Sequence, residues 1–206
     1  TFFKYEGLGS IYWHMVSKLL LAVNDLYLNS NSDDEQLLTE LKSIYYDIRE
    51  GIGTHKNPGL YGAFPTDPYS HTPAYCGVQQ PGMTGQVKED FISRFGELGV
   101  RISNGQISFQ LSLLEISEFI ESDQNFVFYN IHGEKTTLPI KKNSLAFTLA
   151  QVPVIYTLSE QNSIRVNFNN DSVKEYDGLD LCKEVSNSVF NREGKVIKIE
   201  VTLIKV

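Results

Sequence analysis

Two segments of the chain concentrate side chains that could bind a sugar or an anion. The first contains Glu6, Tyr12, Trp13 and His14, and it includes the only tryptophan of the sequence. Aromatic side chains offer a flat apolar face to a sugar ring, and carboxylate or imidazole groups can hydrogen-bond hydroxyls or phosphate. Core packing or helix capping by Trp13 and His14 is an equally good interpretation.

The second segment is a long stretch, residues 53–82, rich in proline, glycine and aromatic residues and without helical or strand periodicity. Its candidate binding side chains supply carboxylate, phenol, imidazole and amide groups, and they are Asp67, Tyr69, His71 and Gln80. Long loops inside compact domains are usually functional or disordered, and the aromatic content argues against disorder. The alternative is a packed surface loop whose polar groups bond its own backbone.

An anion site is indicated directly after this loop. Thr84 and Gly85 stand at the expected start of a helix, where unpaired backbone N–H groups and the helix dipole favour negative charge. Val87 occupies the position at which a capping box would have glutamate, so no side chain of that helix fills the site. The alternative is that Thr84 only caps its own helix.

The other titratable residues carry no catalytic or metal motif. Glu89 and Asp90 are adjacent on the expected helix and point in different directions, so they cannot flank one scissile bond, and we interpret them as solvated or structural. Cys76 and Cys182 encode neither a disulfide framework nor a zinc site. No metal site and no Ser-His-Asp, P-loop or dinucleotide signature is predicted.

Helical spacing of apolar residues predicts the elements that position these groups. A first helix is expected over residues 10–29, with Gly7, Gly9 and Ser10 marking its start. A second follows an N-cap at Ser32 and stops at Gly51. A third begins near Thr84 and ends at residues 96–99. Because three helices and a long loop enclose a core poorly, this part of the chain is expected to need further helices.

Residues 100–206 differ from the first hundred in their sequence pattern: β-rich stretches alternate with turn residues. The stretches expected to form strands are 106–110, 125–131, 145–158, 163–168 and 196–203. A short helix near residues 181–187 is expected to interrupt them. The predicted fold class is therefore α+β, with an antiparallel β-sandwich in the second half.

Composition excludes some partners. The formal net charge of −7 and the absence of a Lys/Arg cluster oppose nucleic-acid binding. The longest apolar run, residues 19–23, is far too short to span a bilayer, so no membrane partner is expected. Cysteine usage favours a reduced, cytoplasmic location. The chain starts at Thr1 without a methionine or a signal-peptide pattern, and we expect it to be part of a longer protein.

Three short motifs together resemble a known enzyme family. They are Gly9–His14, Pro81–Gln86, and Leu98–Ile102 leading into Gly105–Phe109. In this order they resemble the C-terminal third of inverting glycoside phosphorylases of the cellobiose phosphorylase type, within glycoside hydrolase family 94, especially the branch acting on β-1,2-glucooligosaccharides.

The resemblance implies the end of an (α/α)6 helical barrel over residues 1–99, including the functional loop 53–82, and a β-sandwich over 100–206. It implies that His14 contacts phosphate and that Thr84 with the Gly85 amide forms the phosphate-binding turn. By the same resemblance, sugar contacts are expected at Glu6, Tyr12 and Gln80.

The general acid of the family precedes Thr1, so the resemblance implies no catalytic residue in this chain, which is expected to be inactive alone. It implies inorganic phosphate as co-substrate and no cofactor. The expected partners are an oligosaccharide, the remaining barrel and, in a homodimer, a second copy.

The resemblance leaves the reaction open. Gln86 and Lys88 stand in a segment where the family has a sequence of the Ser-Gly-Thr-Ala-Trp type. This difference indicates either altered anion specificity or a related enzyme that uses water as the nucleophile. Phosphorolysis of a β-glucosidic bond is the preferred prediction, and hydrolysis on the same scaffold is the first alternative. The second is a non-catalytic carbohydrate-binding or structural protein, which a linear row of exposed aromatics on the sandwich would favour.

Overall fold

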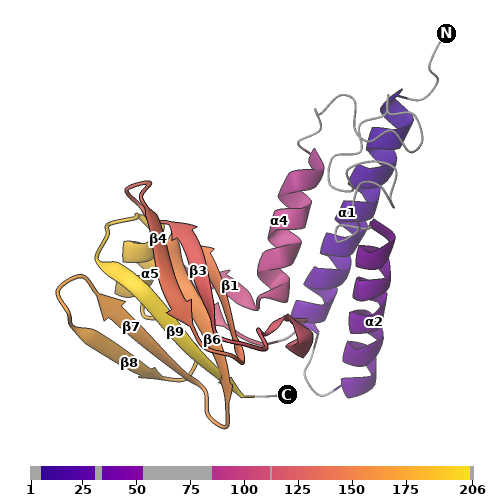
Figure 1. The fold of residues 1–206 in the computed structure, drawn as a ribbon. Helices are drawn as coiled ribbons and strands as arrows, with labels where there is room; N and C mark the ends of the chain where they lie inside the picture. The colour runs from indigo at the N-terminus through magenta and orange to yellow at the C-terminus, as the bar shows by residue number, and fades with distance from the viewer. Residues whose placement is uncertain (1–5, 31–33, 53–84, 112, 205–206) are drawn as a thin grey trace. The chain divides into compact units, whose positions relative to one another are not determined.

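The computed structural model describes residues 6–30, 34–52, 85–111 and 113–204. The chain divides into two compact units, one ending at Glu97 and the other running from Leu98 to Val206. We call them the helical unit and the β unit, and each is described by itself. The α+β class predicted from the sequence is confirmed by helices in both units and strands in the second (Figure 1).

In its described residues, the helical unit contains α1 (Glu6–Asn29), α2 (Glu35–Ile52) and α4 (Gly85–Glu97). Helix α1 lies between the other two (Figure 1). It begins four residues earlier than expected and includes Gly7 and Gly9, so the prediction that these glycines mark its start is wrong. Glycine weakens a helix by about 1 kcal/mol relative to alanine, which is too little to end one that tertiary packing supports.

The ends of α2 also differ from the prediction. Asp34 is its N-cap, because Oδ1 of Asp34 accepts a hydrogen bond of 2.9 Å from the backbone N–H of Leu37. The predicted cap, Ser32, lies outside the described residues. The predicted stop at Gly51 is wrong, since the helix continues to Ile52. The Ile52 side chain is fully buried, and its burial favours one more helical residue after the glycine.

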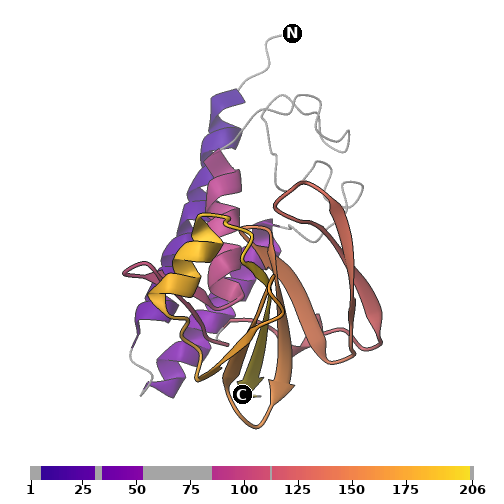
Figure 2. The same ribbon diagram turned by 90° about the vertical axis from the view of Figure 1, so that its left-hand side faces the viewer.

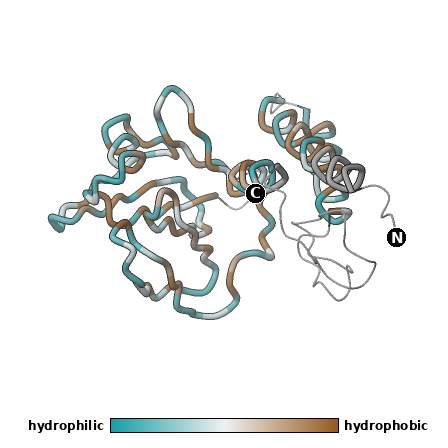
Figure 3. The backbone as a smooth tube through the Cα atoms, turned by 90° about the horizontal axis from the view of Figure 1, so that it is seen from above, coloured by the Kyte–Doolittle hydropathy of each residue, from teal (hydrophilic) through white to brown (hydrophobic). Residues whose placement is uncertain are grey.

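The helical unit exposes an apolar stripe on α1. Met15, Leu19, Ala22 and Leu26 recur at helical spacing, and all four are exposed. Phe91 and Ile92 of α4 are 63% and 45% exposed. Apolar and polar stretches alternate along these helices in Figure 3. The described helices therefore leave part of their apolar surface uncovered.

The main sheet of the described β unit has five strands in the order β5-β6-β9-β7-β8. Their bounds are β5 (Ser144–Leu149), β6 (Val152–Ser159), β7 (Ser163–Phe168), β8 (Val173–Asp177) and β9 (Val196–Ile204). β6 and β9 are parallel, and the other neighbours are antiparallel. The β-rich stretch expected over 145–158 forms two strands, because the chain turns at Ala150 and Gln151 between β5 and β6.

Two hairpins accompany this sheet in the described part of the β unit. One pairs β1 (Val100–Ser103) with β2 (Gln106–Phe109), and the other pairs β3 (Gln124–Tyr129) with β4 (Lys135–Ile140). A 3₁₀-helical turn, η1 (Ile116–Glu118), lies between the hairpins in sequence. Strands β1, β4 and β8 were not predicted. The prediction of an antiparallel arrangement is wrong for β6 and β9, which pair in parallel. The sandwich and the helical barrel stay predictions.

The core of the β unit forms where α5 (Lys183–Phe190) covers one face of the strands (Figure 2). Val185 and Val189 of α5 are buried, as are Ile199 and Val201 of β9. The fully buried Tyr156 donates a hydrogen bond of 2.7 Å to the carbonyl oxygen of Leu98. This bond ties the start of the β unit to the main sheet.

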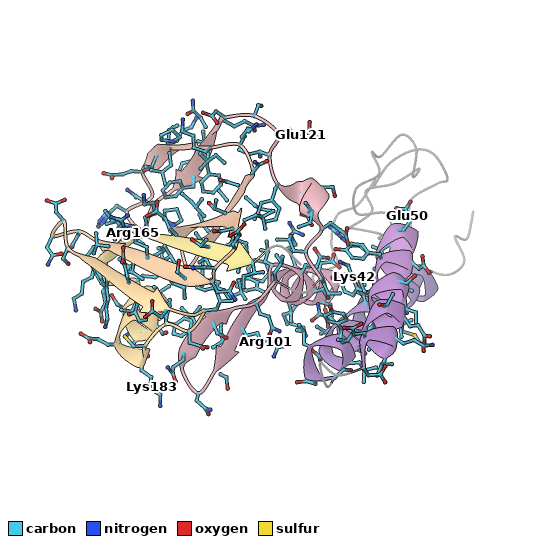
Figure 4. The ribbon with its side chains drawn as sticks, turned by 90° about the horizontal axis from the view of Figure 1, so that it is seen from below. Lys42, Glu50, Arg101, Glu121, Arg165 and Lys183 are labelled. Atoms are coloured by element: carbon cyan, nitrogen blue, oxygen red, sulfur yellow. The ribbon has the colours of Figure 1, made fainter. Side chains whose placement is uncertain are left out.

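Charged residues occupy the surface of both units. Lys42 and Glu50 lie on α2, Arg165 on β7, and Lys183 at the start of α5 (Figure 4). Across the described ranges, no helix is long and apolar enough to cross a bilayer.

Candidate functional site

Two contacts show that α1 and α4 run in the same direction. The hydroxyl of Ser17 lies 3.5 Å from Oδ1 of Asp90. Further along both helices, Nδ2 of Asn24 donates a hydrogen bond of 3.2 Å to the carbonyl oxygen of Ser93. The helices approach so closely there that a Cβ atom at Gly96 would overlap the side-chain amide of Asn24. The first turns of α1 and α4 therefore lie at the same end of the helical unit.

This end carries two of the predicted phosphate-binding residues. His14 precedes Ser17 by three residues, and Gly85 precedes Asp90 by five. With a rise of 1.5 Å per helical residue, these positions lie roughly 5 and 8 Å beyond the Ser17–Asp90 contact. Two motifs about seventy residues apart in the sequence thus reach the same region through the parallel packing of their helices.

The remaining predicted site residues divide into two groups. The first group belongs to α1 and consists of Glu6, Tyr12, Trp13 and His14. Outside the described residues lie Thr84, Asp67, Tyr69, His71 and Gln80. The structure places His14 of α1 and Gly85 of α4 toward the same end of the helical unit, and the contribution of the loop over 53–82 stays a prediction.

Glu89 is buried and Asp90 is half-buried, which favours the structural interpretation of this pair over the solvated one. Glu89 is only 2% exposed, and its Oε1 lies 3.4 Å from Nζ of Lys88. Asp90 is half-buried beside Ser17. Burial raises the pKa of Asp90 to about 6; the Ser17 hydroxyl acts in the opposite direction, and the negative charge of Glu89 adds to the increase. The structural interpretation therefore holds for both carboxyl groups.

The raised pKa of Asp90 gives a testable pH dependence. The folded chain keeps the Asp90 proton up to about pH 6, whereas the unfolded chain releases it near the ordinary aspartate pKa of 3.8. Stability should therefore fall as pH rises from about 4 to 6, and Asp90→Asn should remove that fall. Allowing for partial exposure, we expect the variant to gain about 1 to 2 kcal/mol at pH 7.

Urea unfolding followed by far-UV circular dichroism between pH 4 and 7.5 measures this effect. The exposed Asp25 on α1 supplies the matched control, Asp25→Asn, which should keep the wild-type pH dependence. An unchanged pH dependence in Asp90→Asn would show that other groups cause it.

Sequence reasoning missed a buried ionic network that joins α2 to α4. Oε1 of Glu97 accepts a hydrogen bond of 2.6 Å from the Tyr45 hydroxyl and lies 3.2 Å from Nε of Arg49. Arg94 also pairs with this carboxylate. Burial, reinforced by the negative charge of Glu97, raises the pKa of Tyr45 far above its ordinary value. The network fixes the C-terminal end of α4, and it thereby helps to set the direction in which the first turn of α4 points.

A second unpredicted cluster lies in the β unit. The thiol sulfur of Cys182 is 3.2 Å from the Tyr176 hydroxyl and 3.5 Å from Nζ of Lys174. Burial opposes ionisation of this thiol, but the bonds from Tyr176, the Val185 N–H and Lys174 outweigh it and lower its pKa. Lys174 and Tyr176 lie only eight and six positions before Cys182, but no motif of the sequence marks them, and their contacts become evident only in the fold.

No protein-family model matches the chain, and a search of curated proteins finds none similar to it. Among the described residues, no three His, Cys, Asp or Glu side chains gather closely enough to hold a metal ion. Any functional assignment therefore rests on the motifs and on the geometry that places them.

Proposed function

We propose that this chain is the C-terminal part of an inverting glycoside phosphorylase that cleaves a β-glucosidic bond with inorganic phosphate. The main support is the parallel packing of α1 and α4, shown by the Ser17–Asp90 and Asn24–Ser93 contacts. It brings His14 and Gly85, which come from two separate motifs, to the same end of the helical unit. Such convergence is what a shared anion site requires.

In this proposal, phosphate binds where α4 begins. Backbone N–H groups at the start of the helix and the hydroxyl of Thr84 would donate hydrogen bonds to phosphate oxygens, and the helix dipole would favour its charge. His14 would supply a further donor from α1. Glu6, Tyr12, Trp13 and Gln80, with Asp67, Tyr69 and His71, would contact the sugar.

The reaction would proceed in one displacement. A phosphate oxygen attacks the anomeric carbon on the face opposite the glycosidic oxygen, and the carbon–oxygen bond to the leaving sugar breaks. A carboxylic acid outside this chain donates its proton to the leaving oxygen. The products are an α-glucosyl phosphate and a shortened oligosaccharide. The proposed location is the cytoplasm, where phosphate is abundant and thiols stay reduced.

The exposed apolar stripe on α1 supports the remaining barrel as a partner. Met15, Leu19 and Leu26 are each more than half exposed. At roughly 25 cal/mol per Å² of apolar surface, covering this stripe with another helix would be favourable. We propose that further helices of the same enzyme cover it.

Two alternatives remain in the proposal. Hydrolysis would use the same scaffold with water in place of phosphate. A carbohydrate-binding protein is less well supported, because within the described part of the β unit only Tyr129 is an exposed aromatic residue. One exposed ring does not form the row of aromatics that such a protein would present along a sandwich face.

Substitution of His14 tests the proposed phosphate site. A hydrogen bond to a charged group contributes about 1.5 to 3 kcal/mol, so His14→Ala in the complete enzyme should raise the KM for phosphate by roughly thirtyfold. Lys18 lies one turn further along α1 and is exposed, so Lys18→Ala is the matched control and should leave this KM unchanged. Equal effects of both substitutions would argue against a specific role for His14.

A further inference from the structure

A cavity of about 400 Å³ lies in the β unit, between α5, the β7–β8 hairpin and the residues just before β9. Phe168 of β7, Lys174 of β8, Val185 of α5 and Lys195 line it. Small-molecule sites usually have volumes of about 300 to 1,000 Å³, so the cavity is large enough for a ligand of one or two sugar rings. All its lining residues belong to the β unit, and none is part of the phosphate site proposed above.

An irregularity in the pairing of β7 with β9 lies at the aromatic wall of this cavity. The pairing of β7 with β9 shifts register between Asn167 and Phe168. The backbone N–H of Phe168 donates a hydrogen bond of 2.9 Å to the carbonyl oxygen of Ser172, and Asn169 donates one of the same length to Lys195. Irregularities of the β-bulge kind redirect side chains and occur often beside binding sites. The ring of Phe168 is thus held in the cavity wall by its backbone.

Helix α5 supplies an apolar floor and a polar rim. Val185 and Ser188 are 4% and 8% exposed, respectively, whereas Asn187 and Asn191 are exposed. The two asparagines lie one helical turn apart, and both line the cavity. Their side-chain amides provide donors and acceptors, and the Asn191 side chain also donates a hydrogen bond to the carboxylate of Glu193.

The charged groups of the cavity balance one another. Nζ of Lys195 lies 2.6 Å from Oε2 of Glu193. Nζ of Lys174 lies 5.2 Å from the centre of the Tyr176 ring and within hydrogen-bonding distance of the Cys182 sulfur. With Glu184, the lining holds two positive and two negative groups. No net charge therefore favours an ionic ligand, and a neutral ligand with several hydroxyls can use both the donors and the acceptors.

We propose that this cavity binds a neutral saccharide. The apolar face of one sugar ring would lie on Phe168, and its hydroxyls would bond the amides of Asn187 and Asn191 and the carboxylate of Glu184. One aromatic face and a few hydrogen bonds correspond to a dissociation constant in the millimolar range. This inference does not depend on the proposed phosphorylase activity, because it concerns other residues in the other unit.

The test is a titration of the ¹⁵N-labelled 206-residue chain with cellobiose, followed by amide NMR signals. The side-chain amide signals of Asn187 and Asn191 should shift in a saturable manner. Phe168→Ala should weaken binding at least tenfold. Asn187→Ala, which changes an exposed residue and should keep the fold, should weaken it severalfold. Tyr129→Ala replaces an exposed ring that does not line the cavity, and it should bind like the wild type.

Other outcomes would overturn the proposal. Shifts confined to residues that do not line the cavity, or equal binding by Asn187→Ala and the wild type, would show that cellobiose does not use this cavity. Larger shifts with glutamate or inorganic phosphate than with cellobiose would show that its ligand is ionic. Loss of phosphorolysis in the complete enzyme would leave the result of this titration unaffected.

Discussion

Gly99→Ala is expected to destabilise the β unit by more than about 4 kcal/mol. Gly99 has a φ of +68°, a conformation that costs an L-residue about 1 to 2 kcal/mol. In addition, a Cβ atom at this position would overlap the carbonyl oxygen of Gln110, a backbone atom that cannot rotate away. The backbone N–H of Gln110 also donates a hydrogen bond of 2.8 Å to the Gly99 carbonyl, so moving the strands apart would break their pairing.

Gly105 provides the matched control for this substitution. It has a similar φ of +76°, and a Cβ atom there would meet nothing within 4 Å. Gly105→Ala should therefore lower the free energy of unfolding only by the cost of a positive φ for alanine, about 1 to 2 kcal/mol. Urea unfolding followed by amide NMR signals of β6 and β9 measures both variants. Equal losses would show that backbone conformation, and not the approach of Gln110, makes glycine necessary at position 99.

Glu97→Ala is expected to destabilise the helical unit by about 3 kcal/mol. The substitution removes the carboxylate that Tyr45, Arg49 and Arg94 share, and the fully buried Tyr45 hydroxyl loses its acceptor. Breaking a buried ion pair by removing one partner costs about 3 to 5 kcal/mol. The lower end of this range applies, because the Arg49 and Arg94 side chains are 28% and 36% exposed.

The loss of helical circular dichroism in urea measures this effect. Glu40 lies on the exposed side of α2, where it accepts a hydrogen bond of 2.9 Å from Gln36, and Glu40→Ala should change stability by less than about 0.5 kcal/mol. Tyr45→Phe should cost about 1 to 2 kcal/mol, since it removes one hydrogen bond to a charged group. A Glu97→Ala variant as stable as Glu40→Ala would contradict the assignment of this network.

The elements predicted best from the sequence are those indicated by residues close together in the chain. Apolar spacing placed α4 near its observed bounds of Gly85–Glu97, and the residues 163–168 expected as a strand are those of β7. Asn104 and Gly105 both have positive φ, as their turn signal required. The turn at Ala150 and Gln151 was missed because both residues have positive φ without being glycine or asparagine. Neither alanine nor glutamine is a typical turn residue.

Long-range features could not be predicted from one sequence. Strands β4 and β8 are largely exposed and polar, so they lack the apolar alternation that marks a strand. The direction of α4 relative to α1 depends on the Asn24–Ser93 contact, which joins residues sixty-nine positions apart. The network around Glu97 likewise joins α2 to α4. The motif residues His14 and Gly85 were found from the sequence, whereas their placement at one end of the helical unit required the fold.

The nature of the sugar product tests the proposed function most directly. The complete enzyme would be incubated with a β-1,2-linked glucooligosaccharide, in phosphate buffer and in phosphate-free buffer, and the products identified by ³¹P and ¹H NMR. We expect α-glucose 1-phosphate to form in the first buffer and no cleavage in the second. Free glucose at equal rates in both buffers would contradict phosphorolysis and support the hydrolase, and no cleavage in either buffer would contradict an enzyme acting on this substrate.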